Sequence, residues 1–250
     1  MKAKVTVVIP FYKSNEYLLE TLASIYIQDG VGEVIIVVDK NGGKVKLDGY
    51  NAKKNLKVVV NSTAFQGPGV CRSIGFNLAK CKYVAFLDSD DVWFPFRVKN
   101  HLEYIEKNKL SFSFGGFKHF NSSKKDFQLI TPFGPFNLTN FYKKSFTIGC
   151  LTVIIDKSQI LALPPILIKR RNDYLMWDFV IKQCIELNLN WGGCDLGGCL
   201  AGHRIHNNSL THSKIQSALS YYKFLKVTEL SFLKKIWFFV LYFKNTIGSR

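Results

Sequence analysis

The N-terminal third of the sequence alternates apolar runs that suit buried strands with segments whose apolar residues recur at helical spacing. The run at residues 4–11 is rich in β-branched residues and too continuous for a half-exposed strand, and the run at 33–38 is also of the buried type. The strands are expected at residues 4–11, 33–38, 56–61 and 83–87. The helices are expected at residues 16–27 and 70–79. This order predicts an α/β fold with a mainly parallel sheet flanked by helices, in which ligands bind beyond the carboxyl ends of the strands.

The rest of the chain has a weaker pattern. From about residue 111, aromatic stretches and Pro/Gly turns predict irregular or antiparallel structure. A strand is expected at 151–156 and a helix at 173–187. The end of the chain, 215–243, has a largely helical, amphipathic pattern.

The composition limits the compartment and the partners. Lysine and arginine outnumber aspartate and glutamate by 34 to 18, a formal charge of +16, which favours nucleic acid, an anionic bilayer or phosphorylated small molecules as partners. The six cysteines form no CxxC pair, so neither a zinc site nor a disulfide framework is indicated, and a cytoplasmic location is expected. The longest aromatic-aliphatic run, 236–243, is much shorter than the roughly 20 residues of a spanning helix.

The C-terminal tail interleaves basic and aromatic residues. After Ala201 its only acid is Glu229, whereas lysines recur among rings such as Trp237 and Phe243. This pattern is typical of an interfacial anchor, which would place the protein peripherally on the anionic inner face of the cell membrane. A C-terminal helix that packs on the domain or against a dimer partner explains the same pattern, and the sequence leaves both interpretations open.

An acidic cluster, Asp88-Ser89-Asp90-Asp91, follows the fourth expected strand in a chain that is otherwise poor in acids. In extended backbone, alternate side chains share a side, so Asp88 and Asp90 can face one site. Oxygen ligands from carboxylates, with positions left for phosphate and water, are typical of Mg²⁺ or Mn²⁺. The alternative is that the cluster caps a helix beginning near residues 92–95.

Other strand ends carry candidate nucleotide-binding residues. Asp39 can accept a hydrogen bond from a base or ribose, and the Tyr12 ring can stack on a base, with Pro10 beside it. Arg72 lies near the start of a helix, where the helix dipole disfavours a cation, so it is expected to face a carboxylate or a nucleotide. Ordinary turn and packing roles explain Asp39 and Tyr12 as well, and a surface position would explain Arg72.

Several segments, taken in their order along the sequence, resemble those of a known enzyme family. They are Val-Val-Ile-Pro-Phe-Tyr at 7–12, Glu-Val-Ile-Ile-Val-Val-Asp at 33–39, Gln-Gly-Pro-Gly-Val-Cys-Arg at 66–72 and Val-Ala-Phe-Leu-Asp-Ser-Asp-Asp at 84–91. In order and spacing they resemble the donor-binding half of the family 2 glycosyltransferases, inverting enzymes with a GT-A fold. The resemblance continues through Arg-Asn-Asp-Tyr-Leu-Met-Trp at 171–177 and His-Arg-Ile-His at 203–206. It is strongest to enzymes of bacterial surface-polysaccharide assembly, such as those of the teichuronic-acid type.

The resemblance implies an organisation and a set of roles. It divides the chain into a nucleotide-sugar-binding half (1–110), an acceptor-binding half of the same domain (111–210) and a helical basic-aromatic tail (211–250). It implies that Asp173 is the general base, although N-capping of the following helix would also explain an aspartate there. The remaining roles are metal binding by Asp88, Asp90 and His206, contact of Asp88 with the ribose, and diphosphate binding by Arg204.

The function implied is transfer of a sugar, with inversion, from a UDP-sugar to a glycan or lipid-linked acceptor, with Mn²⁺ or Mg²⁺ as cofactor. A nucleotidyltransferase would need a Gly-rich basic loop directly after the first strand, and Pro10-Phe-Tyr-Lys13 is not one. A non-catalytic basic RNA- or lipid-binding module explains the charge but gives no reason for the convergent aspartates. Nucleic acid is therefore not expected as a partner.

Overall fold

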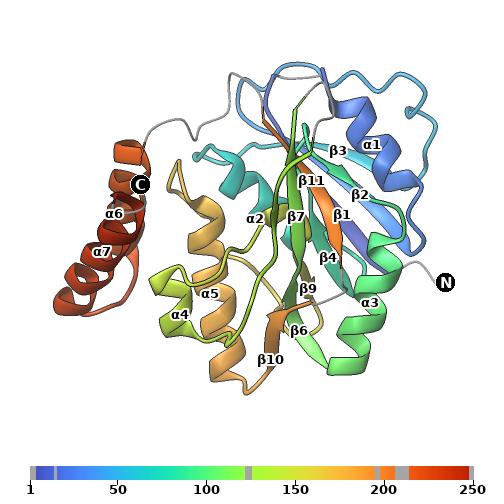
Figure 1. Cartoon of the computed structure of the whole chain (residues 1–250). Coiled ribbons are helices and arrows are strands. Elements are labelled where there is room, and N and C mark those ends of the chain that lie inside the picture. Colours follow the sequence, from blue (N-terminus) through green and yellow to red (C-terminus); the bar gives the residue numbers. More distant parts are fainter. Residues whose placement is uncertain (1–3, 14–15, 122–125, 195–197, 206–213, 248–250) are drawn as a thin grey trace.

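A computed structural model describes residues 4–13, 16–121, 126–194, 198–205 and 214–247 (Figure 1). Its centre is a seven-stranded sheet in the order β10-β6-β9-β4-β1-β2-β3. The strands are β1 (Val5–Phe11), β2 (Val31–Val38), β3 (Leu56–Val60), β4 (Tyr83–Phe86), β6 (Leu110–Phe114), β9 (Ile154–Asp156) and β10 (Asn190–Gly193). Neighbouring strands are parallel except at β9, which is antiparallel to both β4 and β6. The expected mainly parallel α/β sheet is confirmed.

Helices cover both faces of this sheet, which is why its central strands β1 and β4 are buried along their whole length, whereas the edge strand β3 is largely exposed. The helices around it are α1 (Leu18–Tyr26), α2 (Pro68–Leu78), α3 (Arg97–Asn108) and α5 (Asn172–Glu186). Val7 of β1 belongs to the core cluster that contains α1 and α3, whereas its neighbour Val8 belongs to the cluster that contains α2 and α5. Gly75 lets α2 approach the sheet closely, since a Cβ atom there would lie 2.3 Å from Cγ1 of Val8.

A smaller, four-stranded sheet has the order β5-β11-β7-β8, and its residues Trp93, Phe117 and Ala201 are buried in the core cluster that contains α1 and α3. Its strands are β5 (Val92–Trp93), β11 (Cys199–Arg204), β7 (Gly116–Phe120) and β8 (Asp126–Ile130). The chain crosses between the sheets through α4 (Leu138–Lys143) and the 3-10 turn η1 (Cys150–Thr152), which contacts both β4 and β11. This crossing brings η1 against the end of the strand that carries the acidic cluster.

Two local expectations are wrong. The residues after the acidic cluster form β5, which pairs with β11, and helix α3 begins only at Arg97. The aspartates therefore do not cap a helix at 92–95. The strand expected at 151–156 begins only at Ile154, because Cys150–Thr152 forms η1.

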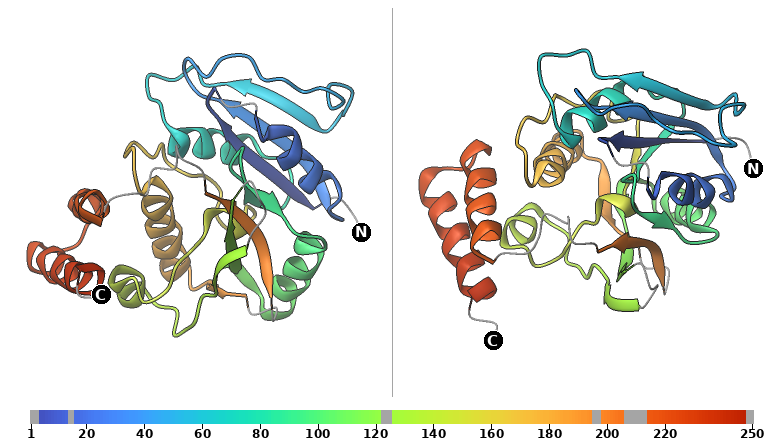
Figure 2. Two further views of the ribbon diagram at one scale, coloured as in Figure 1. Left: turned by 45° about the horizontal axis from the view of Figure 1, so that its top comes forward. Right: turned by 90° about the horizontal axis from the view of Figure 1, so that it is seen from above.

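The C-terminal tail forms a helical hairpin of α6 (Lys214–Val227) and α7 (Phe232–Ile247), which lies beside α4 and α5 (Figure 2). One face packs on the domain, with Tyr221 and Phe224 of α6 and Phe238 of α7 buried in the larger core cluster. Other apolar side chains of the hairpin stay exposed, Phe232 by 75% and Leu233 by 78%. In the described part of the chain, no helix combines the length and apolar character needed to cross a bilayer.

Candidate active site

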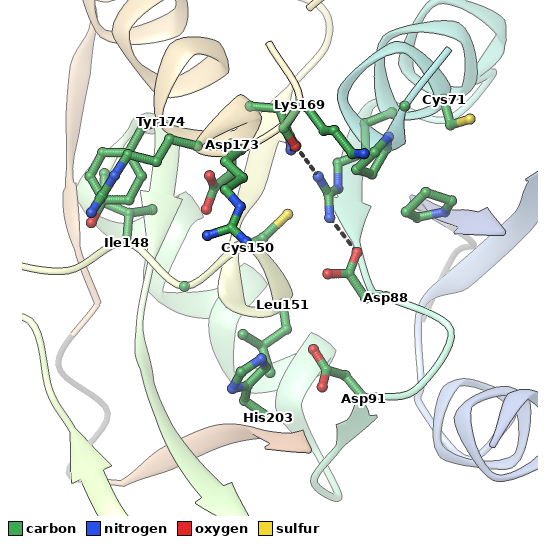
Figure 3. A pocket seen from close by; sticks show the side chains of 18 of the residues that line it. Cys71, Asp88, Asp91, Ile148, Cys150, Leu151, Lys169, Asp173, Tyr174 and His203 are labelled. Carbon is green, nitrogen blue, oxygen red and sulfur yellow. Dashed lines mark hydrogen bonds and ion pairs between the residues drawn. The ribbon is translucent and has the colours of Figure 1, made fainter. Parts of the chain in front are cut away.

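A cavity of about 1030 Å³ lies beyond the carboxyl ends of β1 and β4. The end of β1, the acidic loop after β4 and the start of α2 line one side, and the start of α5 and the hairpin line the other. Figure 3 shows Asp88 and Asp173 on opposite sides of this space. The expected position of the chemistry, at the carboxyl edge of the parallel strands, matches the position of the cavity.

Asp39, one of the residues expected to bind a nucleotide, is held by hydrogen bonds directly after β2. Its Oδ1 accepts a hydrogen bond from Nδ2 of Asn61 (3.0 Å) and its Oδ2 accepts one from the backbone N–H of Gly67 (2.8 Å). Pro10 and Tyr12 line the same part of the cavity, and the Tyr12 ring is half exposed. A fixed acceptor beside an accessible ring is suited to a nucleoside.

Arg72 connects the two sides of the cavity. Its guanidinium is buried, donates from Nη1 to Oδ1 of Asn172 (2.7 Å), and forms an ion pair with Asp88 through Nη2. Burial alone would lower the pKa of Arg72, but the Asp88 carboxylate outweighs it and the pKa is raised. The guanidinium therefore stays charged and fixes the acidic loop relative to the first turn of α5, where Asn172 precedes Asp173.

The aspartates after β4 have different surroundings. Asp88 and Asp90 are half-buried and line the cavity. Asp91 is only 2% exposed, and one of its carboxylate oxygens accepts the backbone N–H of Arg204 (2.9 Å). Burial, together with the charges of Asp90 and Asp88, raises the pKa of Asp91 well above its ordinary value. Asp91 therefore anchors the loop to β11, while Asp88 and Asp90 face the cavity.

The carboxylates that line the cavity fit a divalent cation whose remaining coordination positions are filled by the substrate and by water. Among the described residues, no group of three or more His, Cys, Asp or Glu side chains forms a full metal site. Asp88 and Asp90 supply carboxylate oxygens to one cavity, and Mg²⁺ is commonly bound by one or two carboxylates together with substrate phosphates and water. The third expected ligand, His206, lies outside the described residues.

Asp173 is the second residue of α5 and lines the cavity. The N-cap position belongs to Arg171, in a left-handed conformation (φ 57°), and no side chain caps the helix. The capping explanation for Asp173 is therefore wrong. Its carboxylate reaches the cavity from the side opposite Asp88 (Figure 3), where a base that serves an acceptor would have to lie.

Arg171 joins the start of α5 to the C-terminal hairpin. Its guanidinium donates to Oγ of Ser220 (3.0 Å), Oγ of Ser217 (2.9 Å) and Oη of Tyr242 (2.8 Å). These three hydroxyl-bearing residues also line the cavity. The hairpin is thus part of the site wall, a role that the amphipathic pattern alone did not indicate.

Lys144, directly after α4, also lines the cavity and was not singled out by the sequence. Its Nζ lies 4.0 Å from the centre of the Tyr174 ring. Burial and the nearby charge of Arg171 lower the pKa of Lys144 to about 7, although Asp173 acts in the opposite direction.

Cys150 reaches the cavity from η1. Burial raises the pKa of its thiol well above the ordinary value; Arg72 lowers it, whereas Asp88 and Asp173 raise it further. Because the thiolate is the reactive form, this cysteine is a poor nucleophile.

Arg204 lies differently from what was expected for a diphosphate ligand. Its Nε donates to the backbone oxygen of Asp90 (2.8 Å) and its Nη2 pairs with Oε2 of Glu20 (2.7 Å). The side chain is only 3% exposed and is not among the described residues that line the cavity. In this conformation Arg204 pairs with Glu20 of α1 and donates a hydrogen bond to the backbone of the acidic loop. Arg204 therefore stabilises the position of that loop.

Two histidines, His119 and His203, line the cavity. His119 of β7 and His203 of β11 are register partners on parallel strands, and their Nδ1 atoms are 2.9 Å apart. Burial and the proximity of His203 lower the pKa of His119. The pair could be found only from the register of these two strands, for which the sequence offers no local signal.

Comparison with known proteins identifies the family. The model of Glycosyl transferase family 2 matches residues 6–160, which include the end of β1, the acidic loop and η1. The chain belongs to this family. The glycosyltransferase activity and the family expected from the motifs are thereby confirmed.

Individual relatives support the assignment to this family, and a solved structure supports the fold. The glycosyltransferase TuaG of Bacillus subtilis (strain 168), whose name refers to teichuronic acid biosynthesis, is 30% identical over 100% of this chain and 98% of its own length. The UDP-Glc:alpha-D-GlcNAc-diphosphoundecaprenol beta-1,3-glucosyltransferase WfaP of Escherichia coli is 25% identical over 89% of this chain and 85% of its own. The structure of S. aureus TarS residues 1–349 in complex with UDP-GlcNAc has a TM-score of 0.63 and 19% identity, and covers 98% of this chain and 73% of that chain. This similarity supports the expected GT-A-like fold.

Proposed function

We propose that this glycosyltransferase moves a sugar from a UDP-sugar to a glycan or lipid-linked acceptor in bacterial surface-polysaccharide synthesis, by a single displacement with inversion. The observation that carries the proposal is that Asp88 and Asp90 line one side of a cavity and Asp173 lines the other. The name of WfaP includes a lipid-linked acceptor, GlcNAc-diphosphoundecaprenol, and the structure of TarS contains UDP-GlcNAc.

On the donor side, Asp39 accepts a hydrogen bond from the base or ribose, and Pro10 and Tyr12 form the adjoining wall. Asp88 and Asp90 would hold Mn²⁺ or Mg²⁺, which supplies positive charge to the departing diphosphate. Arg72, buried and charged, keeps Asp88 in place and contributes further positive potential at the same end of the cavity. The leaving group therefore departs on the side of the acidic loop.

On the acceptor side, Asp173 takes the proton of the attacking hydroxyl as the new glycosidic bond forms. Attack from the face opposite the leaving group inverts the anomeric carbon, by the direct-displacement logic of inverting glycosidases. The neutral thiol of Cys150 supports this route over a covalent intermediate at that residue.

The test is a donor screen that measures UDP release, with a short-chain GlcNAc-diphospholipid as acceptor and with added Mn²⁺ or Mg²⁺. We expect UDP release that depends on the acceptor, and a β-linked product from an α-linked UDP-sugar by NMR. A product that retains the donor configuration, or the absence of UDP release with every donor, would contradict the proposal.

We also propose that the exposed face of the hairpin docks on the anionic inner leaflet, where a lipid-linked acceptor would lie. Phe232, Leu233 and Trp237 are exposed, and Lys234 and Lys235 lie between them. The five cysteines whose side chains are described are free, which supports a reducing, cytoplasmic side.

Vesicle sedimentation tests this docking. Since each lysine near an anionic surface contributes about 1 kcal/mol, Lys234→Gln/Lys235→Gln should weaken binding to phosphatidylglycerol vesicles by roughly 30-fold at low salt. Lys107→Gln/Lys109→Gln, on the opposite side of the sheet, is the matched control and should bind like the wild type. Equal binding by both double variants would contradict the membrane role.

A further inference from the structure

The acceptor wall of the cavity has an excess of positive charge. Lys144, Lys169, Arg170 and Arg171 line it together with one carboxylate, that of Asp173. Among the ion pairs of the described residues, none joins one of these four cations to an acid. By contrast, Arg72 on the donor side is paired with Asp88. The unbalanced charge therefore belongs to the side where the acceptor binds.

Lys144 carries most of this argument. Its ammonium group rests on the Tyr174 ring and lies near Arg171, a second cation, and near Asp173, the one carboxylate of this wall. Burying an ammonium group near another cation costs free energy unless an anion joins them. Burial and the charge of Arg171 lower the pKa of Lys144 even though Asp173 acts in the opposite direction, so a single carboxylate does not offset them, and an anionic ligand would raise the pKa again.

The neighbouring hydrogen bonds fit an anion as well. Arg171 is held by hydroxyl groups of Ser217, Ser220 and Tyr242, which are neutral, so its charge is not cancelled. Arg170 is half-buried and Lys169 is exposed. Guanidinium and ammonium groups around one space suit the several oxygens of a phosphoryl group better than a single carboxylate.

The cavity is also large enough for a second substrate. Its volume, about 1030 Å³, is at the upper end of the roughly 300–1,000 Å³ range of single-ligand sites. A donor diphosphate bound at Asp88 and Asp90 would occupy the far side from Lys144. The acceptor wall therefore has both the charge and the room for an anion of its own.

We propose that Lys144, Lys169 and Arg170 form a subsite for a phosphoryl group of the acceptor. The proposal rests on the proposed function and names the chemical class of its second substrate, a sugar carried on a phosphate or diphosphate. The phosphoryl group can come from a lipid diphosphate or from the phosphodiester of a polymer. The hairpin beside the subsite, with its exposed apolar side chains, favours the lipid source.

The first experiment measures acceptor kinetics. A GlcNAc-diphosphoalkyl acceptor is compared with the neutral alkyl glycoside of GlcNAc in the wild type, Lys144→Gln, Arg170→Gln and the double variant. We expect the KM for the diphosphate acceptor to rise about 10-fold in each single variant and roughly 100-fold in the double variant. The KM for the neutral acceptor and for the donor should change less than about twofold in all of them. Lys107→Gln on α3 is the matched control for loss of one charge.

The second experiment separates this subsite from the proposed function. Calorimetric titration of alkyl diphosphate and of oligo(glycerol phosphate) into the protein, without donor or metal, measures binding when no turnover occurs. Weaker binding of either probe to Lys144→Gln supports the subsite, and the tighter probe identifies the source of the phosphoryl group. Unchanged binding of both probes, or a parallel rise in KM for neutral and charged acceptors, overturns the proposal. Absence of UDP release with normal, Lys144-dependent binding would instead contradict the proposed function.

Discussion

Turnover is expected to fall by about 10²- to 10⁴-fold in the Asp173→Asn variant, the usual contribution of a general base. Asparagine keeps the size of the side chain and its place in the first turn of α5 but cannot take a proton at neutral pH. Because the proposed donor site is on the opposite side of the cavity, the Kd of the UDP-sugar should stay within about twofold. Single-turnover kinetics and donor titration measure the two quantities separately.

Glu186→Gln provides the matched control for Asp173→Asn. Glu186 lies on the same helix, is exposed, and does not line the cavity. The turnover of the Glu186→Gln variant should equal that of the wild type. If Asp173→Asn kept more than a tenth of the wild-type turnover at saturating acceptor, Asp173 would not be the base.

Asp90→Asn is expected to lose about 10²- to 10³-fold in turnover, comparable to the loss of one preorganised group that stabilises developing charge. The loss should be accompanied by loss of the response to Mn²⁺. In the wild type, UDP and Mn²⁺ together should raise the Tm more than either alone, because a ligand that binds only the folded state stabilises it in proportion to its affinity. In the variant this cooperative increase should disappear.

The control for Asp90→Asn is Asp29→Asn, an exposed acid near the end of α1 that does not line the cavity. It removes the same charge and should retain both turnover and the Tm response. A full Mn²⁺ response in Asp90→Asn would show that the acidic loop does not hold the cation, and the assignment of the donor side would then be wrong.

The main sheet and the position of the acidic loop could be predicted because both depend on local sequence. The β-branched runs specify strands that are covered on both faces, and a strand that ends at Leu87 must deliver Asp88 to the carboxyl edge of the sheet. Arg72 was expected to meet a carboxylate or a nucleotide, and it pairs with Asp88, which lies only 16 positions further along the chain, after the next strand.

The acceptor side could not be predicted in this way, because its residues meet only through packing. Lys144 follows a short helix without a motif, and His119 reaches His203 only through the register of β7 and β11. Arg204 illustrates the same limit. An arginine side chain is suited to bind a diphosphate. The partner of Arg204, however, is Glu20, which is 184 positions away in the sequence and could be identified only in three dimensions.

The hydrogen bonds between Arg171 and the hairpin bear on how such enzymes diversify. The side of the cavity proposed for the nucleotide is built from consecutive strand and helix units, whereas part of the opposite wall comes from α6 and α7. Substitutions in those two helices can therefore reshape the space proposed for the incoming glycan without disturbing the strands of the proposed nucleotide side. The same catalytic framework could thus be retained in evolution while the tail changes to suit a new polymer.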